Sequence, residues 1–170
     1  MSENGMQDQD SNITNMWGLQ ISAVVDGKVV DIEELEDQIF AQKMIGDGYG
    51  IYPTSQTVYA PCDCKVEQIS PTKHAVYLSI AENLKLLIHI GIDTIELKGE
   101  GFESTLETGM VIEKGQPLIT FDQKLIEAEG LNPVIAVIVL NGSGQELTLD
   151  VFRTDNAKAK ETIAMAINKS

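Results

Sequence analysis

Cationic side chains are scarce in this chain of 170 residues, which carries 12 Lys and Arg against 26 Asp and Glu. The formal net charge of −14 at pH 7 repels phosphate backbones and anionic membrane surfaces, so it argues against nucleic-acid binding. The same charge would attract a basic protein partner. Acidity that serves only solubility is the alternative interpretation.

Long apolar runs are also missing. The longest, residues 134–140, is the size of a strand, whereas crossing a bilayer takes about 20 apolar residues. The amino-terminal residues are polar and acidic, without the basic and apolar regions of a signal peptide. We therefore predict a cytoplasmic protein with no direct membrane insertion.

Cysteine is limited to Cys62 and Cys64, which are separated by one residue. A disulfide across this spacing would be strained, and a cytosol keeps thiols reduced, so free thiols are expected. A zinc site built from these cysteines and the two histidines is disfavoured, because zinc-binding cysteine pairs are usually separated by roughly two to four residues.

Short apolar stretches punctuated by Gly and Pro take the place of long runs from residue 21 to residue 140. This texture predicts an all-β sandwich or barrel. Short helical turns are expected within residues 32–43 and 123–129. Residues 157–168 predict a C-terminal helix, because Ala, Lys and Glu favour helices and Asp155 or Asn156 can cap one.

The chain divides into three predicted parts: a mobile tail over residues 1–19, one domain over 20–150, and a partly helical C-terminal extension over 151–170. Within the domain, residues 23–32 and 60–69 share Ala, Asp, Lys, Val and Ile in register, 37 residues apart. The repeat indicates a sandwich of two related halves, with chance similarity as the alternative.

The chain has only two histidines, so any imidazole chemistry must use His74 or His89. His89 lies in the sequence LLIHIGI at residues 86–92. Alternation along a strand would bury every second side chain here, namely Leu86, Ile88, Ile90 and Ile92. His89 would then share the opposite face with Leu87 and with Gly91, which leaves room beside the ring.

This arrangement suits a nucleophile, since a neutral imidazole attacks phosphorus and its ordinary pKa is about 6.5. Asp93 would bring a carboxylate to the same face if the strand continued. Thr72 lies two residues before His74 and can hydrogen-bond an imidazole nitrogen, which would fix the tautomer. Purely structural roles for both histidines are the alternative at this point.

The spacing from His89 to Asp93 also matches a zinc-ligand pair of some zinc peptidases. Those enzymes need a later His-x-His sequence, which this chain lacks. Phosphate-binding glycine loops and the usual serine, cysteine and lysine nucleophile motifs are absent as well. We therefore predict no permanent metal and no cofactor.

Longer motifs give the histidines a context. The central ones are residues 72–75 (TKHA), 86–94 (LLIHIGIDT) and 97–102 (LKGEGF). Others follow in the same order at residues 37–41, 44–48, 53, 60–61, 115–122 and 132–141. Together they resemble the glucose-type enzyme IIA domain of the bacterial phosphoenolpyruvate-dependent sugar phosphotransferase system.

The resemblance implies an antiparallel β-sandwich of duplicated hybrid type. It also implies a phosphocarrier that takes phosphate from the histidine phosphocarrier protein HPr and passes it to a cysteine on the IIB component of a sugar permease. By the same resemblance, His89 is the phosphorylated nucleophile. His74 would hydrogen-bond the phosphoryl group, and Thr72 would orient His74.

The resemblance places further residues around the histidines. Asp37 and Asp93 would lie at the rim, where their charge meets basic residues of a partner. An apolar docking face for both partners would consist of Phe40, Met44, Ile45, Leu87 and Ile95.

Three features depart from the family pattern. Asp63-Cys64 stands where relatives carry Asp-Gly, the amino-terminal strand begins with residues 22–25 (SAVV) where relatives carry Ala-Pro, and residues from 142 onward match poorly. A regulatory protein that binds others according to its phosphorylation state would need the same His89. A zinc hydrolase on the related scaffold is the second alternative.

Overall fold

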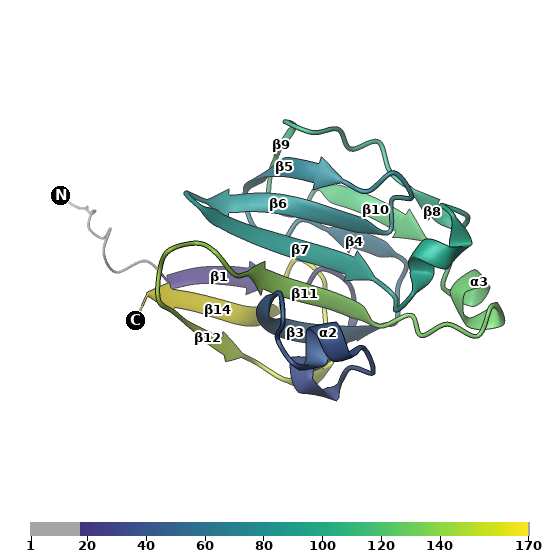
Figure 1. Ribbon diagram of the computed structural model, residues 1–170, viewed down its shortest axis with the longest axis horizontal. Coiled ribbons are helices and arrows are strands. Elements are labelled where there is room, and N and C mark those ends of the chain that lie inside the picture. Colours follow the sequence, from purple (N-terminus) through teal and green to yellow (C-terminus); the bar gives the residue numbers. More distant parts are fainter. Residues whose placement is uncertain (1–17, 170) are drawn as a thin grey trace.

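An eight-stranded antiparallel sheet forms the centre of the molecule, which a computed structural model describes over residues 18–169 (Figure 1). Its order is β13-β2-β3-β11-β7-β6-β5-β9. The strands are β2 (Gly27–Asp31), β3 (Gly46–Pro53), β5 (Cys64–Ile69), β6 (Ala75–Ala81), β7 (Leu84–Ile90), β9 (Val111–Ile112), β11 (Ile135–Leu140) and β13 (Thr154–Ala157).

Two three-stranded antiparallel sheets accompany it, in the orders β1-β14-β12 and β4-β10-β8. The first consists of β1 (Gly18–Ser22), β12 (Leu147–Val151) and β14 (Ile163–Lys169), and the second of β4 (Thr57–Tyr59), β8 (Phe102–Glu103) and β10 (Pro117–Phe121). The short helices are η2 (Ile32–Glu34), α2 (Gln38–Ala41), η3 (Thr94–Leu97) and α3 (Gln123–Ala128). The predicted all-β fold and its two short helical regions are confirmed.

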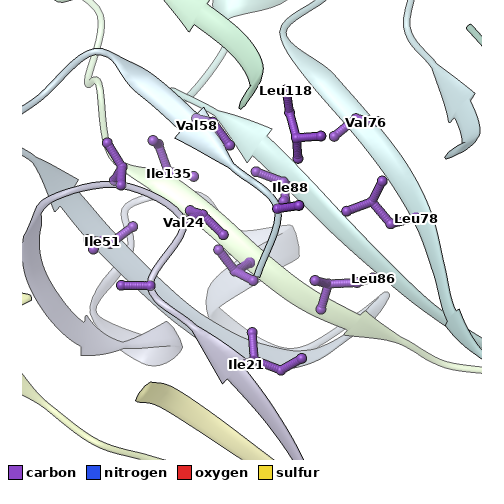
Figure 2. Packing of buried hydrophobic residues seen from close by; sticks show 14 of the residues in the cluster. Ile21, Val24, Ile51, Val58, Val76, Leu78, Leu86, Ile88, Leu118 and Ile135 are labelled. Atoms are coloured by element: carbon purple, nitrogen blue, oxygen red, sulfur yellow. The ribbon is translucent and has the colours of Figure 1, made fainter. Parts of the chain in front are cut away.

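The main core lies between the large sheet and the two small ones. Figure 2 shows its aliphatic side chains, which come from all three sheets and include Ile21 of β1, Val58 of β4 and Ile88 of β7. Full burial of such a side chain stabilises the fold by roughly 1.5–3 kcal/mol. The sheets pack face to face and do not close into a barrel, so of the two predicted forms the sandwich is the right one.

A second, smaller apolar cluster covers the opposite face of the large sheet. Its members come from β2, η2, α2, β6, β7 and β11 and the residues beside them: Val30, Ile32, Leu35, Phe40, Ala75, Leu87, Val134, Ala136 and Ile138. Alternate residues of β7 therefore enter different clusters, with Leu86, Ile88 and Ile90 in the main core as predicted. Ile92 packs against the second cluster, because β7 ends at Ile90 and the chain turns at Gly91.

The predicted C-terminal helix over residues 157–168 is wrong. This segment contains a turn followed by β14, which pairs with β1 on one side and with β12 on the other. Ala164, Met165 and Ile167 are fully buried in the main core. Pairing on both edges together with this burial outweighs the modest helix preference of Ala, Lys and Glu.

The boundaries at residues 20 and 150 stay a prediction, although β12 runs across the second of them. Most of the predicted tail, residues 1–17, lies outside the described residues, whereas Gly18 and Leu19 belong to β1.

Hydrogen bonds in the two repeated segments match one another. The backbone N–H of Ala23 donates to the carbonyl of Thr162 (2.8 Å), and that of Ala60 donates to the carbonyl of Gln116 (2.9 Å). The first turn continues with Asp26, whose carboxylate accepts from the N–H of Ala159 at 2.8 Å. Its counterpart Asp63 accepts from the N–H of Lys114 at 2.9 Å.

The repeat is therefore structural, as the sequence indicated. It also explains the C-terminal segment, because the turn that leads into β14 is the counterpart of the turn that leads into β10. Both turns contain a residue with a left-handed φ, which is Lys160 (73°) in the turn before β14 and Gly115 (88°) in the turn before β10.

Candidate active site

The two histidines meet because β6 and β7 form a hairpin. His74 directly precedes β6, and His89 in β7 lies opposite Ala75. The carbonyl of His74 accepts a hydrogen bond from the N–H of Ile90 at 2.8 Å, which fixes the register at this end. The two imidazole rings lie edge to face, with their centroids 4.9 Å apart and an angle of 81° between their planes.

One nitrogen of His89 is already engaged. Its Nδ1 lies 2.9 Å from the carbonyl oxygen of Gly91. A carbonyl can only accept, so in the neutral ring Nδ1 carries the hydrogen and donates it. The lone pair then resides on Nε2, which is the nitrogen that can attack.

His74 is held by the residue that the sequence singled out. The hydroxyl Oγ1 of Thr72 lies 2.6 Å from Nδ1 of His74, so the predicted contact is present. Lys73 between them adopts a left-handed φ of 61°, which brings the two side chains to the same side of the turn. With Nδ1 occupied by the hydroxyl, Nε2 of His74 is the nitrogen left for another group.

Burial keeps both rings neutral. It lowers the pKa of His74 to about 4, with a smaller contribution from the neighbouring His89. Burial also lowers the pKa of His89, against the opposing effects of the bond to Gly91 and of the carboxylates Asp37 and Asp93. A neutral imidazole has one nitrogen with a free lone pair, which can act as a nucleophile, and one N–H, which can donate a hydrogen bond.

Aromatic rings form the walls around the pair. Phe40 of α2 lies edge-on to His89, with 5.2 Å between the ring centroids. Phe102 of β8 lies 6.2 Å from His74 in the same way. Phe102 was not predicted as a site residue, although it ends one of the sequence motifs, because β8 approaches His74 only in the folded chain.

The two predicted rim carboxylates both lie close enough to act on the charge of His89. Asp37 also caps α2, since its carboxylate accepts from the N–H groups of Ile39 (2.8 Å) and Phe40 (3.3 Å). Asp93 is exposed and sits at the start of η3 with a left-handed φ of 61°. The strand therefore does not continue to Asp93, and a turn brings it to the site instead.

The residues of the predicted docking face differ in exposure. Met44 is 62% exposed and Ile95 is 61% exposed, whereas Ile45 is half-buried. Phe40 and Leu87 are buried in the second cluster, so they support this surface from below in the free chain. Ile39, which is 49% exposed, belongs to the same segment and was not singled out from the sequence.

Other reactive groups do not join the histidines. Cys62 and Cys64 are free thiols buried in the main core. Burial raises the pKa of Cys62 to about 12 and that of Cys64 to about 11, so neither is a thiolate at pH 7. Over residues 18–169 no three His, Cys, Asp or Glu side chains gather closely enough to hold a metal ion. Likewise, the described part of the chain has no helix of the length and apolarity needed to cross a membrane.

Known proteins share both the sequence and the fold. Residues 19–144 match the family of the phosphoenolpyruvate-dependent sugar phosphotransferase system, EIIA 1. The chain is 43% identical over 128 residues to a glucose-specific EIIA component of Staphylococcus epidermidis, covering 75% of this chain and 77% of that protein. It is 44% identical over 132 residues to a glucose-specific EIICBA component of Staphylococcus saprophyticus, covering 78% of this chain and 20% of that protein.

Among solved structures, glucose permease IIA from Mycoplasma capricolum superposes with a TM-score of 0.80 at 32% identity. The match covers 88% of this chain and 96% of that one. The β-sandwich with its paired histidines is thus a phosphotransferase component of a sugar-transport system. More narrowly, the chain belongs to the EIIA 1 family of the phosphoenolpyruvate-dependent sugar phosphotransferase system.

Proposed function

We propose that Nε2 of His89 accepts a phosphoryl group from phosphorylated HPr and later transfers it to a cysteine thiolate of a IIB component. In the first step an N–P bond forms to His89 while the N–P bond of the HPr phosphohistidine breaks. In the second step a P–S bond forms and the bond to His89 breaks. The observation that carries this proposal is the 2.9 Å contact of Nδ1 with the Gly91 carbonyl, which leaves the Nε2 lone pair available.

His74 assists in this scheme by donating a hydrogen bond to the phosphoryl oxygens. Thr72 accounts for its orientation, because the 2.6 Å contact occupies Nδ1 and leaves Nε2 of His74 for the phosphoryl group. Phosphoryl transfer between aligned nucleophiles depends mainly on positioning and on stabilising the oxygens in the transition state. Because the pKa of His74 is about 4, the ring is neutral at pH 7 and donates this hydrogen bond without transferring a proton.

Both partners would dock on the same surface in turn. Met44, Ile95 and Ile39 present apolar contacts, while Asp37 and Asp93 add negative charge for a basic partner face. An apolar contact excludes water from the transferring group, so phosphate passes between proteins and is not hydrolysed. The relative named an EIICBA component supports permease components as partners. The proposal places the transfer in the cytoplasm.

Incubation with phosphoenolpyruvate, enzyme I and HPr, followed by intact mass measurement, tests the first step. One added phosphoryl group is expected, labile in acid and stable in base. Adding a purified IIB domain should then remove it from this chain and place it on IIB. Labelling without onward transfer to IIB would favour the regulatory function that the same histidine permits, and absence of labelling would refute both.

A further inference from the structure

The peptide group between Ile90 and Gly91 is held at both of its polar atoms. Its carbonyl oxygen accepts a hydrogen bond from the hydroxyl of Thr94 at 2.5 Å. Its N–H donates to the carbonyl of Val134 at 2.8 Å. Thr94 is fully buried and is one of few buried polar side chains among residues 18–169. A peptide fixed in this way cannot rotate without losing a buried hydrogen bond.

The next atoms along the chain are fixed by packing. Gly91 has a φ of 79°, and a β-carbon placed on it would lie 2.3 Å from the Cγ2 methyl of Thr94. The methyl group therefore fills the space that a side chain would need. The carbonyl of Gly91 belongs to the next peptide, whose N–H on Ile92 donates to the carbonyl of Asn132 at 2.9 Å. The hydroxyl and methyl of Thr94 fix the backbone on the other side of the Gly91 α-carbon, and the Gly91 carbonyl is the acceptor for Nδ1 of His89.

We propose that Thr94 is a positioning residue for phosphoryl transfer, which holds the Gly91 carbonyl so that His89 keeps its hydrogen on Nδ1 and its lone pair on Nε2. The inference deepens the proposed function and rests on it for the transfer step. It gives a functional reason for a threonine at the first position of η3. Without the hydroxyl, the Ile90–Gly91 peptide is held at its N–H alone, by the bond to Val134. The Gly91 carbonyl can then shift away from Nδ1, and either tautomer of His89 becomes available.

The tautomer can be tested without any partner. Nitrogen NMR of the imidazole rings in the unphosphorylated chain reports which nitrogen of His89 carries the hydrogen. Thr94→Val keeps the shape and the methyl but removes the hydroxyl, and it should convert His89 to a mixture of tautomers. Thr94→Ser keeps the hydroxyl and should retain the Nδ1–H form. Retention of the single Nδ1–H form in Thr94→Val would overturn the inference, whatever the outcome of the phosphorylation assay.

Transfer kinetics supply the second readout. Thr94→Val should slow phosphorylation by HPr at saturating donor by on the order of tenfold or more, with little change in KM, because positioning and not docking is impaired. Thr94→Ser should stay within about threefold of wild type. The matched control is Thr162→Val, since Thr162 also bonds the backbone through its hydroxyl (2.8 Å to the N–H of Lys158) but lies in the turn before β14.

Thermal unfolding separates this role from a structural one. Thr94→Val and Thr162→Val are each expected to lower the melting temperature, and only the first should change the tautomer and the maximal rate. If Thr94→Val does not fold, Thr94→Ala takes its place. It removes the hydroxyl together with the methyl, so its comparison with Thr94→Ser, which lacks only the methyl, isolates the hydroxyl. Equal losses of rate in Thr94→Ser and in the variant without a hydroxyl would contradict the proposal, because the hydroxyl would then not be the group that matters.

Discussion

The two halves of the large sheet share one scaffold and carry different side chains. In one half, His89 of β7 lies between two alanines of the neighbouring strands. The equivalent position in the other half is Ile138 of β11, which lies between Leu87 and Gly48. Ile138 is fully buried in the second cluster, so the position that carries an imidazole in one half carries aliphatic packing in the other.

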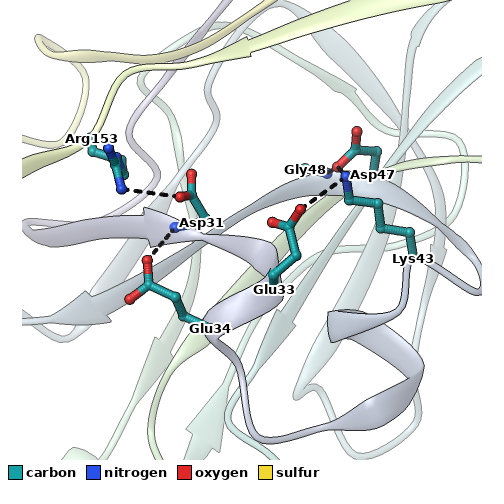
Figure 3. Close-up of polar contacts among 7 residues, drawn as sticks. All are labelled: Asp31, Glu33, Glu34, Lys43, Asp47, Gly48 and Arg153. Atoms are coloured by element: carbon teal, nitrogen blue, oxygen red, sulfur yellow. Dashed lines mark hydrogen bonds and ion pairs between the residues drawn. The ribbon is translucent and has the colours of Figure 1, made fainter.

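The two halves also differ at the residue before Ala75, which lies opposite His89, and before Gly48, which lies opposite Ile138. His74 precedes Ala75 in one half, and Asp47 precedes Gly48 in the other. Asp47 pairs with Lys43 (3.6 Å), which also pairs with Glu33 (3.1 Å), at the surface (Figure 3). Exposed pairs of this kind contribute about 0–1 kcal/mol each. A duplicated scaffold therefore offers two equivalent positions, and the choice of side chains decides which one becomes a site.

The largest effect is expected from replacing His89, the residue that distinguishes the two halves. His89→Gln keeps the strand and a polar side chain but has no nucleophilic nitrogen, so phosphorylation by HPr should be abolished. Intact mass measurement after incubation with the phosphate donors checks this. Cys62 and Cys64 remain in this variant as buried thiols, and full labelling of the variant would show that His89 is not the acceptor.

A second variant separates the roles of the two histidines. His74→Gln leaves Nε2 of His89 free, so phosphorylation by HPr should still occur. Onward transfer to IIB should fall by on the order of 100-fold, because the donor that stabilises the phosphoryl oxygens is changed. Rapid-quench measurement of phosphate on both proteins gives the two rates. Onward transfer at the normal rate would leave His74 with a structural role only.

The third effect concerns stability against pH. The pKa of His74 is about 4 in the folded chain, below the ordinary value near 6.5, so between these values the unfolded chain binds a proton that the folded chain does not. This favours unfolding as the pH falls from 6.5 towards 4. At pH 4.5 the loss from this residue is about 2 kcal/mol relative to pH 7.

Urea unfolding of wild type and His74→Gln at pH 7 and pH 4.5 gives the free energy of unfolding of each protein at each pH. The contribution of His74 is the difference between the two proteins in how much of this free energy is lost on acidification. Carboxylates contribute equally to both proteins and cancel. Glutamine does not titrate, so the variant should lose less stability on acidification. The Ile138 half contains no imidazole and adds nothing to this difference. Parallel losses in the two proteins would mean that His74 titrates normally in the folded chain.

Local signals predicted two features of the histidine site. Alternation in residues 86–92 separates His89 from the core residues, and the Thr72–His74 contact spans only two residues. Those signals left structural roles open for both histidines, and it was the resemblance to the enzyme IIA family that placed them side by side. The fate of β14 was not predictable in this way, since its helix-favouring residues become a strand only by pairing with β1 and β12. The contacts of Phe102 with His74 and of Thr94 with the Ile90 carbonyl were also not predictable, because they form only when separate turns and strands come together.

The smallest expected effect tests whether negative charge near the site has a function. Asp37→Asn should reduce the salt dependence of HPr association by a few fold at most, because exposed charges act over a Debye length of about 10 Å at 0.1 M salt. An asparagine oxygen can still cap α2, so the docking segment should keep its shape. Asp47→Asn is the matched control, as it removes the same charge from the other half of the sheet. Stopped-flow association rates should therefore lose salt sensitivity in Asp37→Asn and keep it in Asp47→Asn. Equal slopes in wild type and both variants would mean that the net charge of −14 serves solubility and does not guide the partner to His89.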